Sequence, residues 1–120
     1  MPFLFDKHSE GGERFQRWLK FHRENPKVWK LFQYFAWEAW GVRERFGARM
    51  IWERMRWYTQ VETTDCDYKL NDHYPPYYAR LLAWTFEEFD SFFELRGDSD
   101  VDRETFLRLV NQPAKGNDDE

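Results

Sequence analysis

The 120-residue chain has the length of one domain, and its single cysteine, Cys66, excludes a disulfide framework and a thiolate zinc site. It carries 22 acidic and 18 basic side chains and a net charge of −4. No apolar run approaches the roughly 20 residues that a membrane-spanning helix needs. No basic, apolar leader opens the sequence either, so we expect a cytoplasmic protein.

The apolar residues predict five helices after an irregular arm over residues 1–11. Their spacing, and the capping residues beside them, place these helices at residues 12–24, 26–40, 47–61, 77–95 and 104–110. Asn25 and Pro26 are typical of a helix start, and Gly41 of a helix end. Residues 65–71 show no helical period, so this segment forms either a loop or a short β-hairpin.

We therefore predict an all-α fold, a compact bundle of four to five helices that spans residues 1–111 as a single domain. The polar residues 112–120 predict a disordered tail. The order helix, turn, helix, irregular segment, helix also fits a helix-turn-helix protein.

Aromatic residues are abundant, with seven Trp, six Tyr and twelve Phe. At about 100° per residue, most join one apolar stripe on each predicted helix. Met50, Trp57 and Val61 form a second stripe opposite the first. A central position in the bundle is the favoured explanation for it, and a binding surface is the alternative. For Trp37 and Trp84, which fall outside their stripes, we expect a surface role. The candidate interface residues are Tyr34, Trp37, Trp57 and Trp84.

Basic and polar residues on the third predicted helix and around the start of the fourth suggest DNA binding as an alternative. Arginine and asparagine read base edges, whereas lysine and tyrosine reach phosphates. The candidates are Arg49, Arg56, Lys69, Asn71, Tyr77 and Arg80. Interspersed acids and the negative net charge argue against this function. The alternative role for these cations is internal ion pairing.

Charge is unevenly distributed along the chain. Residues 13–60 contain eleven Lys or Arg and five Asp or Glu, whereas residues 87–105 contain two and eight. Either the basic part attracts a charged partner, or the two parts face each other within the fold.

Patterns typical of catalysis or metal binding are lacking in the sequence, and its three histidines have no ligand spacing. The acids from Asp98 to Asp102 resemble the start of a calcium loop. However, Arg103 stands at the sixth position, where Gly is needed, and Leu109 at the twelfth, where Glu is needed. We interpret these acids as helix caps. We expect no enzymatic activity, no metal and no cofactor.

Two strings stand out, Tyr68-Lys69-Leu70-Asn71 and Pro76-Tyr77-Tyr78-Ala79-Arg80. With shorter strings, among them Gly47-Ala48-Arg49, they make residues 25–96 similar to a family of small uncharacterised proteins encoded by phages and prophages. The resemblance implies a phage or prophage setting, and hence the cytoplasm of a bacterial host. It implies no activity, substrate or catalytic residue.

Together these observations predict a non-enzymatic, phage-type accessory protein that binds a protein partner or itself through surface aromatics. The alternatives are a helix-turn-helix-like DNA-binding protein and a structural virion component. The sequence indicates neither a membrane nor a small-molecule substrate.

Overall fold

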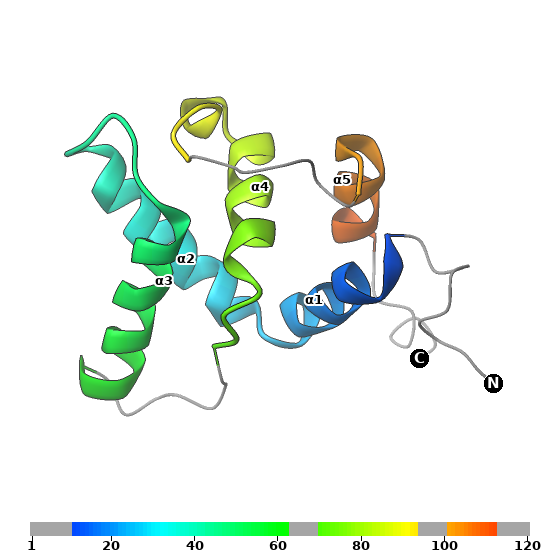
Figure 1. Cartoon of the computed structure of the whole chain (residues 1–120), viewed down its shortest axis with the longest axis horizontal. Helices are drawn as coiled ribbons and strands as arrows, with labels where there is room; N and C mark the ends of the chain where they lie inside the picture. The colour runs from blue at the N-terminus through cyan, green and yellow to red at the C-terminus, as the bar shows by residue number, and fades with distance from the viewer. Residues whose placement is uncertain (1–10, 63–69, 94–100, 113–120) are drawn as a thin grey trace. The chain divides into compact units, whose positions relative to one another are not determined.

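A computed structural model describes residues 11–62, 70–93 and 101–112, and its regular elements are all helices (Figure 1). The helices are α1 (Gly12–Glu24), α2 (Pro26–Trp40), α3 (Ala48–Trp57), α4 (Pro75–Thr85) and α5 (Arg103–Asn111). A π-helical turn, Tyr58–Glu62, continues α3, and a 3-10 turn, Glu87–Phe89, follows α4. These residues contain no β-strand, so the all-α prediction is confirmed. The predicted loop or hairpin at 65–71 lies outside them, except for its last two positions.

The chain divides into two compact units. Unit 1 combines the two ends of the chain, residues 1–24 and 97–120, and unit 2 is the continuous stretch 25–96. The single domain predicted from the sequence is thus built of two parts. At the first crossing between the units no linker is present, because Asn25 alone separates α1 from α2.

Unit 1 is held together by aromatic rings from helices at opposite ends of the chain. The ring of Phe106 in α5 lies 5.4 Å from that of Phe15 and 5.3 Å from that of Trp18, both in α1. All three side chains are fully buried. The Arg23 guanidinium donates a hydrogen bond to the backbone carbonyl of Leu109 at 2.8 Å, which satisfies an acceptor in the last turn of α5.

The first turn of α5 is capped by a side chain. The Asp102 carboxylate accepts a hydrogen bond from the backbone N–H of Thr105 at 3.1 Å. This bond satisfies one of the free donors of the first helical turn, so the predicted capping role is confirmed for Asp102. The other acids of the predicted cap, at 98 and 100, lie outside the described residues.

The core of unit 2 forms where α2, α3 and α4 meet (Figure 1). The Phe32 ring of α2 lies 6.5 Å from Trp52 of α3, 5.7 Å from Tyr78 of α4 and 6.0 Å from Phe93. Trp52 and Tyr78 also stack on each other, with their rings 5.7 Å apart. Every residue of α4 from Tyr77 to Ala83 is buried, which makes α4 the central helix of this unit.

Helix α4 is shorter than the sequence predicted, and the expected continuation to residue 95 is wrong. The helix ends at Thr85, and Phe86 has an extended backbone with φ −121° and ψ 122°. The chain then turns so that Phe86 and Phe89 lie 5.6 and 4.6 Å from the ring of Trp37. Tertiary contacts between rings therefore override the helical pattern of the sequence.

Candidate functional site

Large hydrophobic side chains that remain exposed are concentrated in one segment of the described chain. Their exposed fractions lie between 44% and 71%, and they are Tyr34, Trp40, Val42, Met50, Trp57 and Val61. All come from α2, the turn after it, α3 and the π-helical turn. The described parts of α1, α4 and α5 contribute none. The exposed large hydrophobic side chains described in unit 2 thus belong to α2, α3 and the segments that follow these two helices.

The second apolar stripe of α3 is exposed to solvent. Ile51, Trp52 and Met55 are buried on the inner side of this helix, whereas Met50 and Trp57 are 61% and 59% exposed. The favoured explanation, that this stripe marks a central helix, is therefore wrong. The reason is that α4 takes the central position, and α3 needs only one apolar face to pack on its neighbours.

The four interface candidates from the sequence separate into two groups. Tyr34 and Trp57 are exposed. Trp37 is half-buried because Phe86, Phe89 and Trp40 surround its ring, and Trp84 is half-buried as well. Trp37 and Trp84 are thus only partly exposed, and the surface role expected for them stays a prediction.

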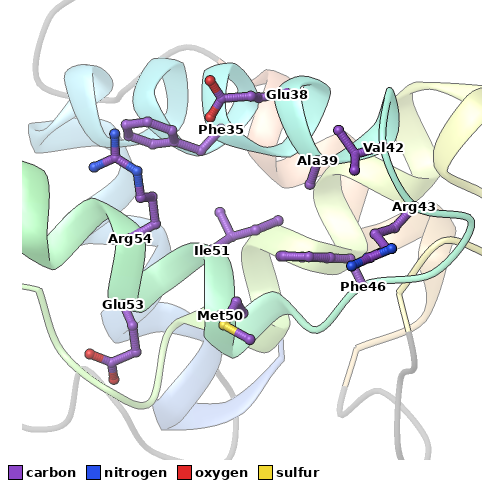
Figure 2. A pocket seen from close by; sticks show the side chains of 10 residues that line it. All are labelled: Phe35, Glu38, Ala39, Val42, Arg43, Phe46, Met50, Ile51, Glu53 and Arg54. Carbon is purple, nitrogen blue, oxygen red and sulfur yellow. The ribbon is translucent and has the colours of Figure 1, made fainter.

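A groove of about 540 Å³ lies between α2 and α3 (Figure 2). Its wall on the α2 side comes from Phe35, Glu38, Ala39 and, in the turn that follows, Val42. Met50 and Arg54 contribute from α3, and Figure 2 shows Arg54 extending across towards Phe35. Neither this groove nor a role for Val42 was predicted from the sequence. An apolar residue in a polar turn directly after Gly41 was the available signal.

Helical spacing extends this apolar surface beyond the groove. Tyr34 precedes Glu38 by one helical turn and therefore lies on the same side of α2. Trp57 follows Met50 by seven residues and so lies on the same side of α3. Val61 continues this side one turn further, in the π-helical segment. We define the α2–α3 face as the groove together with Tyr34, Trp57 and Val61.

Two of the four charged groups in the groove wall have partners. The Arg54 guanidinium carbon lies 4.4 Å from the centroid of the Phe35 ring, and Arg54 also forms an ion pair with Glu62 at 3.2 Å. Glu53 is paired with Arg56 at 3.0 Å.

Glu38 and Arg43 are the other two charged groups. Both are exposed, and neither side chain forms a hydrogen bond or an ion pair with another residue in the described part of the chain. The groove therefore presents one unpaired acid and one unpaired base to solvent.

Arg56, a predicted DNA contact, is engaged within the molecule. Its guanidinium binds the carboxylates of Asp72 and Glu53 and the backbone carbonyl of Leu70. The hydrogen bond to Asp72 is the main reason why the pKa of Arg56 is raised, and the same bond lowers the pKa of Asp72. This is the internal ion pairing that the sequence analysis left as the alternative.

The remaining DNA candidates are divided between buried, exposed and undescribed positions. Tyr77 and Arg80 are 3% and 8% exposed, because the central position of α4 buries them, and their role as surface contacts is corrected. Arg49 and Asn71 are exposed, and the Asn71 side-chain oxygen accepts a hydrogen bond from the backbone N–H two residues later. Lys69 lies outside the described residues.

Within residues 11–62, 70–93 and 101–112, no group of three or more His, Cys, Asp or Glu side chains is placed to hold a metal ion. In the same residues, no helix combines the length and the apolar character that crossing a membrane requires.

Fold and surface together define a small all-α protein with an apolar groove between two helices. The sequence matches no protein-family model, and no curated protein or solved structure is significantly similar to it.

Proposed function

We propose that this protein acts by binding a protein chain through the α2–α3 face and does not catalyse a reaction. The observation that carries the proposal is the concentration of exposed hydrophobic side chains. Of the six in the described residues, five belong to this face. Exposed hydrophobic residues are ordinary when scattered, but a contiguous apolar patch with a polar rim is typical of an interaction site.

The shape of the face supports a protein ligand. Apolar side chains of a partner are favoured in the groove because their transfer from water is favourable. Amphipathic helices commonly bind in grooves of this kind. Trp57 and Tyr34 flank the groove, and these residue types are enriched among the side chains that dominate binding energies.

DNA binding is less well supported than protein binding. Arg56 is neutralised by its acidic partners, and Tyr77 and Arg80 are buried. Arg49 and Asn71 remain as exposed candidates in the described chain. The phage or prophage setting, including the virion-component alternative, stays a proposal that rests on the resemblance over residues 25–96.

Site-specific photo-crosslinking tests the proposed face. A photoreactive residue is placed at Met50 or Trp57, and at Thr85 as an exposed control on α4 in the same unit. In cells that naturally make the protein, we expect covalent adducts with a protein from the first two positions and none from the control. Equal incorporation without adducts at Met50 and Trp57, or equal adducts at Thr85, would contradict the proposal.

A gel-shift measurement tests the DNA alternative. We expect no shift of duplex or single-stranded DNA at low salt, where contacts to phosphates are strongest. A complex whose affinity falls steeply with salt, and falls further in the Arg49→Gln variant, would favour DNA binding instead.

A further inference from the structure

The two unpaired charges of the groove have opposite sign and lie on one short stretch of chain. Glu38 is in the last turn of α2, and Arg43 is in the turn that follows it. Figure 2 shows Ala39 and Val42 on the stretch between them. A ligand that satisfies both charges must present a base to Glu38 and an acid to Arg43, with an apolar segment between the two.

We propose that this ligand is a second copy of the same chain, docked about a two-fold axis so that Glu38 of each copy pairs with Arg43 of the other. The inference rests on the proposed binding function of the α2–α3 face and names its partner. A two-fold interface brings residue i of one copy to residue j of the other, and j to i. One unpaired acid and one unpaired base on the same face meet this condition without any further residue.

The apolar residues between the charges suit the region near the axis. Ala39 is small, so the two α2 helices approach each other closely there. Val42, 71% exposed in the single chain, then packs against the groove of the other copy and loses its contact with water. Burial of this apolar surface supplies the affinity. The two charge pairs, which lie near solvent, set the register and the choice of partner.

Charge exchange distinguishes this arrangement from other occupants of the groove. In a dimer of the Glu38→Arg variant, the new arginine of each copy faces Arg43 of the other copy, so the two side chains repel each other. In a dimer of the Arg43→Glu variant, the new glutamate of each copy faces Glu38 of the other copy, with the same result. When the two variants are mixed, every contact between unlike chains again joins an arginine to a glutamate. Only contacts between copies are restored in this way, and the double variant Glu38→Arg/Arg43→Glu also restores them.

The chain offers matched controls in the same turn. Glu44→Arg and Arg45→Glu make the same changes of charge at exposed residues that do not line the groove. All the substituted side chains are exposed, so each variant is expected to keep the helical circular dichroism of the parent.

Sedimentation equilibrium and light scattering measure the outcome. We expect the mass to rise with concentration from 14.9 kDa towards twice that value. Each single variant at the groove should raise the dissociation constant about tenfold to a hundredfold. The equimolar mixture and the double variant should recover the dissociation constant of the parent chain. Both controls should leave this constant unchanged.

Three results would overturn the second copy as partner. The first is a parent chain that stays monomeric up to about 1 mM, the weak end of specific association. The second is a mixture that fails to recover the association, and the third is a mass that grows beyond two chains, because a two-fold contact closes on itself. A monomer whose photo-crosslinks at Trp57 join a different protein would remove this inference and leave the proposed function standing.

Discussion

The guanidinium of Arg54 lies over the ring of Phe35, with 4.4 Å between its central carbon and the ring centroid. This contact joins α3 to α2 in the wall of the groove, at a point where Phe35 is otherwise buried. Arg54 also pairs with Glu62 in the π-helical turn. One side chain thus connects three elements, so its removal tests whether the groove is held in shape by local contacts.

Replacing Arg54 by Ala should lower the free energy of unfolding by about 1 kcal/mol, the combined size of a partly exposed cation–π contact and a surface ion pair. Urea unfolding followed by circular dichroism measures the change. Arg45→Ala is the matched control, because the exposed Arg45 side chain has no contact of this kind in the described residues. Equal stability of the two variants would show that the stacking contributes nothing.

Phe106→Ala should loosen unit 1 and leave unit 2 folded. The substitution removes the ring that packs on Phe15 and Trp18, and the loss of a buried Phe commonly costs about 3 to 5 kcal/mol. Hydrogen exchange by mass spectrometry should show faster exchange in α1 and α5 and unchanged protection in α4. If α4 lost protection to the same extent, the two units would unfold as one cooperative body.

His22 should make unit 1 less stable in mild acid. Burial, with the charge of Arg23 as the second cause, lowers the pKa of His22 from 6.5 to about 4, and its ring stacks on Trp18 at 5.0 Å. Between these pH values the unfolded chain binds more protons than the folded one, so stability falls as the pH drops from 6.5 to 4. Through His22, the free energy of unfolding is about 3 kcal/mol higher above pH 6.5 than below pH 4.

Urea unfolding between pH 4 and pH 8 measures this effect against the His22→Phe variant, which keeps an aromatic ring and removes the titration. The difference in the free energy of unfolding between parent and variant should change between pH 4 and pH 6.5 and remain constant from pH 6.5 to pH 8. A difference that is independent of pH would mean that His22 is protonated as easily in the folded chain as in the unfolded one.

Arg56→Gln should raise the pKa of Asp72 and release the segment before α4. The bond from Arg56 is the main cause of the lowered Asp72 pKa, whereas Arg49 acts through its charge alone and more weakly. NMR titration of the Asp72 carboxyl carbon should therefore show a larger rise for Arg56→Gln than for the control Arg49→Gln. Faster exchange of the His73 and Tyr74 amides should accompany it. An unchanged titration would indicate that the ion pair does not persist in solution.

Local signals in the sequence were sufficient for most of the helices. The start of α2 at Pro26 and its end before Gly41, the range Gly12–Glu24 of α1 and the start of α3 at Ala48 follow from proline, glycine and apolar spacing. Such signals act over a few residues. They did not predict that α4 ends at Thr85. This end depends on the contact between the rings of Trp37 and Phe89, which are about fifty residues apart in the chain.

The candidate site was predictable in part. The second apolar stripe of α3 was visible in the sequence, and so were Tyr34 and Trp57. Whether that stripe is covered depends on which helix occupies the centre of unit 2. The sequence favoured α3 as the central helix, whereas in the structure α4 is central. The groove itself was not predictable from the sequence, because its walls come from two helices. Which of its charged groups are unpaired was not predictable either, since this depends on the ion pairs that Glu53 and Arg54 form in the folded chain.

By itself, then, the sequence determined the class of fold and most helix boundaries, because these depend on neighbours three or four positions away. The tertiary structure alone decided three further properties: the packing of α1 on α5 through Phe106, the burial of Tyr77 and Arg80, and the exposure of Met50. Each of them depends on contacts between residues distant in the chain, and a helical pattern shows which residues share a face but not what covers it.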